Sequence, residues 1–315
     1  MTDNAPIIFI HYGNNPYLKY VFKTAKTTNP NKKIILLGDN SNKELAIKNG
    51  VEHYDFKDYD RGEQLNIFEK SYKFIAGTTH GRENWTKFVF KRWYIMRVFL
   101  KTHNINSFWT FDSDNLILCN LEDLEPVLNN FDCTEQCKGN CMNGYISNFN
   151  VVDGYIKKMN ELFNREEYIS HQIDNLSKHP DFAYTEMRAY ATYKKEEGIK
   201  SKRLSIIEKN KVFDDAVCIP ENMEAYNKKL GGYNLKKIYF ANNGEVYCIE
   251  KKTGEYIKMM NLNLSWVPLY IFEDICKHVT RAPRIKTIKL YNIHNEPFIY
   301  KLRNNIARIK TFISH

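Results

Sequence analysis

The chain has 315 residues, of which 43% are hydrophobic and 26% are charged, and these are ordinary values for a globular protein. Its length permits one large domain or two small ones, either of which buries a core without disulfides or metals. No segment approaches the roughly 20 apolar residues of a membrane-spanning helix, and the first residues lack the basic stretch and cleavage site of a secretory signal. We therefore expect a cytoplasmic protein.

Positive charge is concentrated at the C-terminal end. The chain has 46 Lys and Arg against 37 Asp and Glu, a formal net charge of +9. Residues 277–315 hold nine of the basic residues and one acid, Glu296, so this segment carries +8 and the rest of the chain +1. A body so close to neutral argues against a surface that binds nucleic acid. We expect one domain over residues 1–275 and a basic extension over residues 276–315.

The cysteines predict free thiols. There are seven, an odd number, which fits a reducing compartment. Cys133, Cys137 and Cys141 are spaced by four residues, unlike the CxxC pairs of zinc sites. This spacing favours a loop or one face of a helix over a metal site.

The N-terminal half alternates between strand and helix patterns. Apolar residues predict a strand over 7–10, followed by a turn and by a helix that ends near 29–30. A strand over 33–37, a short helix over 43–49 and a strand over 51–54 continue the pattern. This βαβ alternation predicts a parallel sheet with helices on its faces.

A longer helix leads to the most informative motif. Aromatic and apolar residues recur at intervals of three and four over 84–103, and a strand over 107–111 then ends at Asp112-Ser113-Asp114. Open α/β sheets bind ligands at the carboxyl ends of their strands. In a regular strand the two acids would point to opposite faces, so a bend at Ser113 is needed for them to converge.

Hard carboxylate oxygens suit Mg²⁺ or Mn²⁺, and such an ion would bridge the two phosphates of a nucleotide diphosphate. The alternative interpretation of Asp112 and Asp114 is a turn whose acids cap a helix. Two other features fit a nucleotide: the aromatic, Gly-containing loop at residues 11–13, and the cations Lys91 and Arg92 on the preceding helix. An ordinary turn and surface ion pairs are the alternatives for these two features.

These segments together resemble the metal-dependent GT-A glycosyltransferases, and most closely a group of bacterial and viral sugar transferases. The resemblance covers about residues 6–270 and is strongest in residues 6–42, in KRWYIMRVFL (91–100) and in FWTFDSDNLIL (108–118). It implies a Rossmann-like α/β fold, in which helices flank a mixed, mainly parallel sheet. The implied reaction moves a sugar from a nucleotide diphosphate-sugar to a hydroxyl of a glycan, a lipid-linked sugar or a polysaccharide. UDP-sugars are favoured over GDP-sugars as donors.

The resemblance also assigns roles to individual residues. Asp112 and Asp114 fall on the metal-binding DxD motif. The nucleotide-contacting positions are His11, Tyr12 and Gly13, together with Asp39 near the nucleoside. Gly144 and Ser147 match a segment that approaches the donor sugar, although the His of that segment is Tyr145 here.

Later residues match the family less closely. Thr185-Glu186-Met187 resembles a segment that opens a helix, so Glu186 is the candidate catalytic base or acceptor-binding carboxylate, with Asp181 as its rival. An acid that is merely favoured by the helix dipole is the alternative. Asn263 occupies the position of a C-terminal His that often completes the metal shell. An amide oxygen binds a hard cation more weakly than a carboxylate, and His278 or His294 would be the substitutes.

Two other functions fit the same residues. A nucleotidyltransferase also uses sheet-edge acids and Mg²⁺, but it would need a phosphate loop rich in Gly and cations after the first strand. Residues 11–16 contain one Gly and no cation. A non-catalytic binding module on a GT-A frame is the second alternative, and Asn263 is the residue that favours it.

The basic extension contains an amphipathic pattern. Its apolar residues form one helical stripe flanked by Lys and Arg: Ile299, Leu302, Ile306, Ile309 and Ile313. Such a helix fits peripheral contact with an anionic membrane, and it also fits packing against the catalytic domain.

Overall fold

The computed structural model describes residues 5–77, 83–227, 229–230, 232–281 and 291–292, the last pair by backbone alone. They form two compact units, and the expected domain 1–275 is divided between these units. The first unit comprises the described parts of 1–15, 29–113 and 120–206, and the second those of 16–28, 114–119 and 207–315. Of the expected extension 276–315, residues 282–290 and 293–315, including the amphipathic stripe, lie outside the described residues.

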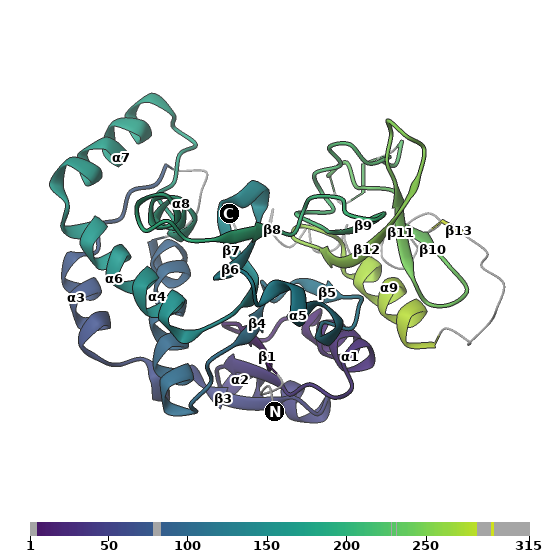
Figure 1. Cartoon of the computed structure of the whole chain (residues 1–315), viewed down its shortest axis with the longest axis horizontal. Coiled ribbons are helices and arrows are strands. Elements are labelled where there is room, and N and C mark those ends of the chain that lie inside the picture. Colours follow the sequence, from purple (N-terminus) through teal and green to yellow (C-terminus); the bar gives the residue numbers. More distant parts are fainter. Residues whose placement is uncertain (1–4, 78–82, 228, 231, 282–290, 293–315) are drawn as a thin grey trace, which may run out of the picture. The chain divides into compact units, whose positions relative to one another are not determined.

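A seven-stranded, mostly parallel sheet lies at the centre of the first unit (Figure 1). Its strands in spatial order are β3 (Glu52–Asp55), β2 (Ile34–Gly38), β1 (Ile7–Ile10), β4 (Phe108–Thr110), β7 (Cys141–Ile146), β6 (Cys133–Gln136) and β8 (Ser201–Arg203). β1 is parallel to β2 and to β4, whereas β7 runs antiparallel to β4 and to β6. The expected mixed α/β class is confirmed, and the sheet is compatible with a Rossmann-like fold.

The first elements follow the predicted alternation closely. β1 and β2 are nearly uninterrupted runs of Ile, Leu and Phe, and such runs are typical of parallel strands buried on both faces. α1 (Leu18–Thr28) follows β1, and α2 (Asn40–Lys48) follows β2. α2 begins three residues earlier than expected because Asp39 caps it and forms a capping box with Asn42.

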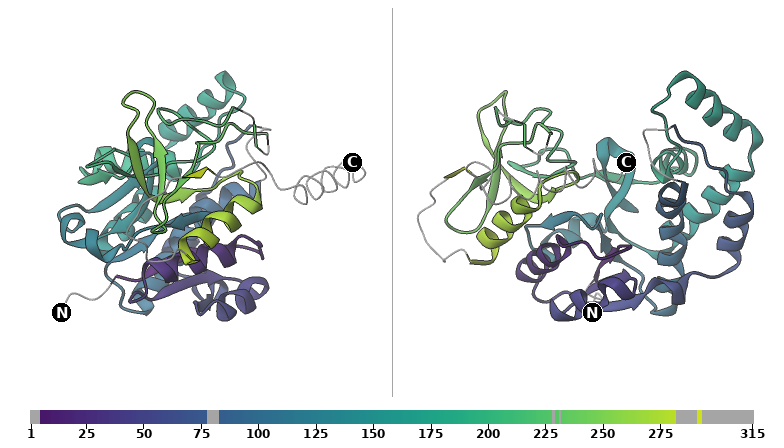
Figure 2. Two further views of the ribbon diagram at one scale, coloured as in Figure 1. Left: turned by 90° about the vertical axis from the view of Figure 1, so that its right-hand side faces the viewer. Right: turned by 180° about the vertical axis from the view of Figure 1, so that it is seen from behind.

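Five helices gather on one side of this sheet (Figures 1 and 2). They are α3 (Glu63–Ser71), α4 (Glu83–Thr102), α6 (Phe149–Asn164), α7 (Glu166–Lys178) and α8 (Glu186–Glu196). Aromatic rings fill the core between them: Phe90 and Phe163 have their ring centroids 5.1 Å apart, and the hydroxyl of Tyr94 donates to Asn160 Oδ1 at 2.8 Å. Short elements complete the unit: η1 (Phe56–Tyr59), η2 (Glu122–Leu124), α5 (Glu125–Leu128) and η3 (Cys137–Gly139).

The order β3-β2-β1-β4 positions the candidate site. From β1 the chain moves outward through β2 to β3, and it then returns to the other side of β1 to form β4. Open α/β sheets bind ligands at such a switch point, beyond the carboxyl ends of the strands. In this unit those ends are Ile10 of β1 and Thr110 of β4.

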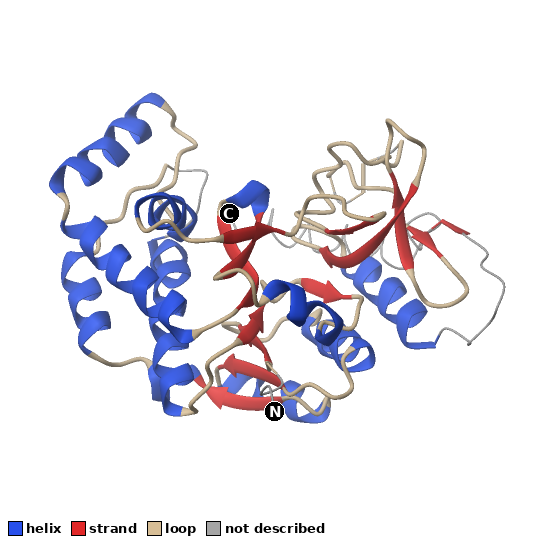
Figure 3. Cartoon of the chain, viewed as in Figure 1, coloured by secondary structure: helices blue, strands red, loops and turns tan. Residues whose placement is uncertain are grey.

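The second unit contains a six-stranded sheet. Its path is β13 (Tyr291–Asn292), β10 (Tyr239–Phe240), β11 (Val246–Ile249), β12 (Tyr256–Asn263) and β5 (Asn115–Ile117), while β9 (Lys211–Phe213) pairs with β12. α9 (Leu269–Arg281) packs on α1, where the rings of Tyr17 and Phe272 stack with centroids 5.0 Å apart. The described part of the segment from β9 to β10 is mainly loop, drawn tan in Figure 3.

All seven cysteines are free thiols. Cys133 and Cys141 begin β6 and β7, and Cys137 lies in the turn that connects these strands, so their regular spacing reflects a hairpin. Among the described helices, none is both long enough and apolar enough to cross a lipid bilayer.

Candidate functional site

The loops that follow β1 and β4 meet at the switch point. His11 Nδ1 lies 2.7 Å from the hydroxyl oxygen of Ser113. Burial lowers the pKa of His11 to about 4, although Asp39 acts in the opposite direction, so the imidazole is neutral at pH 7. This contact fixes the β1 loop against the residue that separates Asp112 from Asp114.

Asp39 and Asn42 hold the β1 loop from the end of β2. The backbone N–H of Gly13 donates to Asp39 Oδ2 at 2.6 Å, and Asn42 Nδ2 donates to the carbonyls of His11 (3.1 Å) and Gly13 (2.9 Å). Burial opposes ionisation of Asp39, but hydrogen bonds from Ser41 and Gly13 outweigh it and lower the pKa of this carboxyl. Gly13 has φ +86°, a backbone conformation that glycine adopts without strain. The contacts of Asp39 therefore shape the loop on which His11, Tyr12 and Gly13 lie.

Tyr12 presents an aromatic surface on this loop. Its side chain is 70% exposed, and its ring centroid lies 6.0 Å from that of Phe56 and 6.2 Å from that of Phe88. The two neighbouring rings support Tyr12 while leaving much of it accessible. An exposed ring of this kind can stack on a nucleobase.

Arg92 joins two of the candidate acids. Its Nη1 donates to Asp112 Oδ1 at 2.7 Å, and its Nη2 donates to Glu186 Oε1 at 2.8 Å. The side chains of Arg92, Asp112 and Glu186 are 17%, 34% and 8% exposed, so this network is largely shielded from water. Burial raises the pKa of Glu186 to about 6, although Arg92 acts in the opposite direction.

Lys91, the neighbour of Arg92 in the chain, forms ordinary ion pairs at the surface. Lys91 Nζ lies 2.9 Å from Asp60 Oδ2 and 3.3 Å from Glu69 Oε1, and all three side chains are partly exposed. The predicted phosphate contact of Arg92 stays a prediction, because both ends of its guanidinium bind carboxylates.

Two buried donors lie next to this network. Arg92, Asp112 and Asn143 line a cavity of about 10 Å³, and Asn143 is 3% exposed. Arg92 Nε and Asn143 Nδ2 have no hydrogen-bond partner among the described residues. A cavity of this size holds about one oxygen-bearing group.

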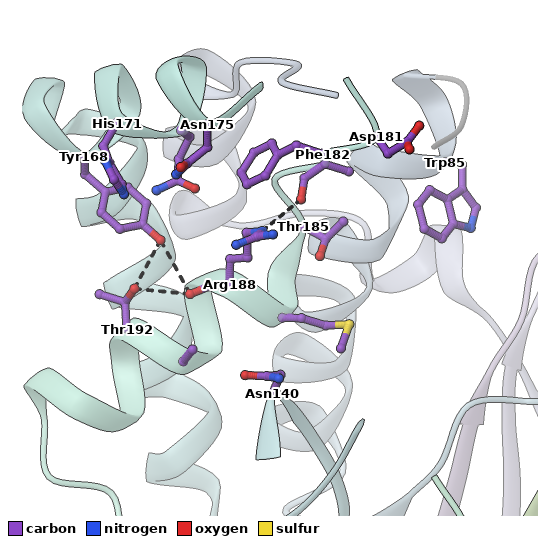
Figure 4. Close-up of a pocket in the computed structure, with 14 residues that line it drawn as sticks. Trp85, Asn140, Tyr168, His171, Asn175, Asp181, Phe182, Thr185, Arg188 and Thr192 are labelled. Carbon is purple, nitrogen blue, oxygen red and sulfur yellow. Dashed lines mark hydrogen bonds between the residues drawn. The ribbon is translucent and has the colours of Figure 1, made fainter. Parts of the chain in front are cut away.

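The two rival catalytic acids lie in different surroundings. Glu186 is the first residue of α8, and the Tyr155 hydroxyl donates to its backbone carbonyl at 2.5 Å. Asp181 lies on the loop before α8 and lines a pocket of about 670 Å³ (Figure 4). Of this pair, Glu186 is linked to Asp112 through Arg92.

Gly144 and Ser147 make structural contacts within the sheet. Gly144 pairs with Thr110 and has φ +95°, and a Cβ added there would lie 2.3 Å from Thr134 Oγ1. The N–H and the hydroxyl of Ser147 both donate to the carbonyl of Asp132, at 3.0 and 2.9 Å. These contacts give Gly144 and Ser147 a structural role that needs no ligand. The expected approach of both residues to a donor sugar stays a prediction.

In the second unit, Asn263 lies beside Asp114. Strand pairing sets Asn263 opposite Asn115, the residue after Asp114. The Ser265 hydroxyl lies 2.8 Å from Asp114 Oδ2 and 2.7 Å from Asn263 Oδ1. The two residues that the resemblance assigns to one metal shell thus contact the same hydroxyl group. Ser265 was not predicted, and its only signal is its position two residues after Asn263.

A buried network anchors this group. Asp214 is 1% exposed, and it accepts from the backbone N–H of Asn263 at 3.1 Å and from Lys236 Nζ at 2.5 Å. Its own N–H donates to Asn261 Oδ1 at 2.6 Å, and Asn261 Nδ2 donates to Asn115 Oδ1 at 2.6 Å. These bonds fix the end of β12 against the start of β5.

Asp112, Asp114, Asn263 and Ser265 carry hard oxygen atoms of the kind that Mg²⁺ and Mn²⁺ prefer. Among the described residues, no group of three or more His, Cys, Asp or Glu could hold a metal ion. Mg²⁺ nevertheless needs only one or two carboxylates when substrate phosphates and water supply the other ligands. Of the substitute ligands, His278 packs on Phe240 with ring centroids 4.3 Å apart, and His294 lies outside the described residues.

Comparison with known proteins adds no family assignment. A scan against protein-family models finds no match, and a search of the curated proteins finds none.

Proposed function

We propose that this protein is a GT-A-type glycosyltransferase that moves a sugar from a nucleotide diphosphate-sugar to a hydroxyl acceptor. The contact between His11 and Ser113 carries the proposal, because it joins the β1 loop to the acidic β4 loop at the switch point. This edge of an open α/β sheet is where nucleotides bind. Asp112, on the same β4 loop, is also connected through Arg92 to Glu186, which supplies a candidate base near the nucleotide site.

The donor nucleotide fits the β1 loop. We assign the base to the exposed ring of Tyr12, and the ribose and phosphates to the backbone of residues 11–13, which Asp39 and Asn42 hold in place. UDP-sugars are the favoured donors. The loop lacks the cations and repeated glycines that a nucleotidyltransferase uses to bind a triphosphate, so a diphosphate whose charge is met by a metal fits it better.

Asp112 and Asp114 are the residues that would hold Mn²⁺ or Mg²⁺. Asp112 and Asp114 are two residues apart along the chain, and both carboxylates can bind one cation where the chain bends at Ser113. Asn263 and Ser265 add neutral oxygen atoms beside Asp114. When bound, the ion supplies positive charge that stabilises the leaving nucleoside diphosphate.

Glu186 is the residue that we assign as the base. Its pKa of about 6 keeps it ionised at neutral pH while leaving it basic enough to accept a proton. In the proposed step, the acceptor hydroxyl gives its proton to Glu186 and its oxygen bonds to the anomeric carbon of the donor sugar. The bond from that carbon to the phosphate oxygen breaks, and its electron pair leaves with the nucleoside diphosphate.

Product analysis tests this function. The protein is incubated with Mn²⁺ and either UDP-sugars or a nucleoside triphosphate with a sugar phosphate, and nucleoside diphosphate and pyrophosphate are quantified separately. We expect release of UDP, at least by slow transfer to water, and none from Asp112→Asn. Formation of pyrophosphate from a nucleoside triphosphate and a sugar phosphate would instead identify a nucleotidyltransferase.

A further inference from the structure

The proposed function leaves unused a pocket in the first unit. It has a volume of about 670 Å³, within the range of small-molecule sites, and it opens among α7, α8 and the start of α4 (Figure 4). Thr185 and Met187 line it, and they flank Glu186 in the sequence. The pocket therefore lies at the first turn of α8, the helix that begins with the proposed base.

An exposed tryptophan lies at this pocket. Trp85 is 54% exposed, and its indole N–H has no hydrogen-bond partner among the described residues. In the view of Figure 4, Trp85 and Asp181 lie at one end of the pocket and His171 and Asn175 at the other, with Arg188 between them. The flat indole face matches the C–H face of a pyranose ring, and its N–H suits a sugar hydroxyl.

Gln172 contributes an amide side chain to the lining of the pocket. This residue is 4% exposed. An amide in this position both donates and accepts, which suits the hydroxyl groups of a sugar.

Arg188 offers a fixed pair of donors. Its Nε donates to the carbonyl of Ala183 at 3.2 Å, and its guanidinium carbon lies 4.1 Å from the centroid of the Phe182 ring. Both contacts hold the guanidinium plane in position, and Nη1 and Nη2 have no partner among the described residues. Asp181 lines the same pocket, so the lining carries an acid as well as a base, and a neutral ligand fits better than an anion.

We propose that this pocket binds the acceptor of the reaction, as a neutral sugar at the end of a glycan. The sugar ring stacks on Trp85, and its hydroxyls bond with Gln172 and with the terminal nitrogens of Arg188. This inference rests on the proposed function, since it takes Glu186 as the base that receives the proton of the acceptor.

Binding and hydrolysis measurements on the full chain test this proposal. Neutral hexoses, N-acetylhexosamines and their disaccharides are screened by saturation-transfer NMR in the presence of UDP and Mn²⁺. We expect at least one sugar to bind the wild type, and Trp85→Ala and Gln172→Leu to weaken its binding by about tenfold or more. The matched control is Ile173→Ala, an exposed residue on α7 outside the pocket, which should bind as the wild type does. Thermal unfolding confirms that each variant is folded.

Donor hydrolysis separates this proposal from the function on which it rests. We expect Trp85→Ala to keep the wild-type rate of UDP-sugar hydrolysis while losing transfer to the sugar. Hydrolysis without any sugar binding, or sugar binding equal in wild type and both pocket variants, would overturn the acceptor pocket and leave the glycosyltransferase intact. Failure of the wild type to bind or hydrolyse any nucleotide-sugar would overturn the enzyme, and Trp85-dependent sugar binding would then still support a carbohydrate site.

Discussion

The imidazole of His11 lies 2.7 Å from the hydroxyl of Ser113, and this contact joins the residue after β1 to the loop after β4. These strands are neighbours in the sheet but lie about a hundred residues apart in the chain. The contact therefore closes the switch point of the sheet, and it couples the proposed nucleotide loop to the proposed metal-binding acids.

His11 should make stability depend on pH. Its pKa is about 4 in the folded protein against an ordinary value of 6.5, so the unfolded chain binds the proton first as the pH falls. The contribution of the neutral His11 imidazole to the free energy of unfolding is complete above pH 6.5 and is lost as the pH falls toward 4. We predict that His11→Asn reduces the drop in free energy of unfolding between pH 7 and pH 4.5 by about 2 kcal/mol. Urea titrations at both pH values measure this, and an identical drop in variant and wild type would contradict it.

Arg92 should contribute far more to stability than its neighbour Lys91. Arg92→Met leaves Asp112 and Glu186 without their shared cation in a shielded site, and we predict a loss of about 3–5 kcal/mol. Lys91→Met removes a similar double contact from a partly exposed position, where the loss should not exceed about 1 kcal/mol. Urea unfolding of both variants gives the comparison. Equal losses would show that Arg92 does not hold a buried charge network.

Glu186 should set the acidic limb of the pH–rate profile. A base must be ionised before it accepts a proton, and burial raises the pKa of Glu186 to about 6. We predict that kcat/KM for transfer falls tenfold per pH unit below about pH 6. Glu186→Gln should remove most of the activity, and any remaining activity should lack this limb. A wild-type limb near pH 4.5, or an unchanged limb in the glutamine variant, would exclude Glu186 as the base.

Ser265 should tune metal affinity without being essential. Its hydroxyl contacts both Asp114 and Asn263, and loss of such an orienting contact weakens metal binding by about 10- to 100-fold in characterised sites. We predict that Ser265→Ala raises the Mn²⁺ concentration needed for half-maximal UDP binding about tenfold. Ser177→Ala, on α7, removes a hydroxyl that bonds only to a local carbonyl and should change nothing. An equal Mn²⁺ requirement in both variants would place the metal away from Ser265.

The local parts of the fold were predictable from the sequence. The strands after residues 6 and 33 and the helix near 84–103 follow from apolar runs and periodicity, because these signals lie within a few residues of one another. The early start of α2 was also readable, since Asp39 and Asn42 have the spacing of a capping box.

Long-range contacts were not predictable in this way. Arg92 and Glu186 are 94 residues apart, and nothing in either segment indicates that they pair. Asn263 was associated with the metal shell only through family resemblance, and its hydrogen-bonding group with Ser265 follows from the pairing of β12 with β5. Gln172 looks like any helical glutamine in the sequence, and only the structure shows that it is buried and lines the pocket.

Isothermal titration with UDP tests the central claim most directly. We predict that UDP binds the wild type in the presence of Mn²⁺ and much more weakly in its absence, and that Asp112→Asn and Asp114→Asn each remove the metal-dependent gain. Asp60→Asn, which changes a surface acid paired with Lys91, should bind UDP as the wild type does. UDP affinity that is unchanged by Mn²⁺, or that is equal in all three variants, would contradict the proposal that these two acids hold a metal against a nucleotide diphosphate.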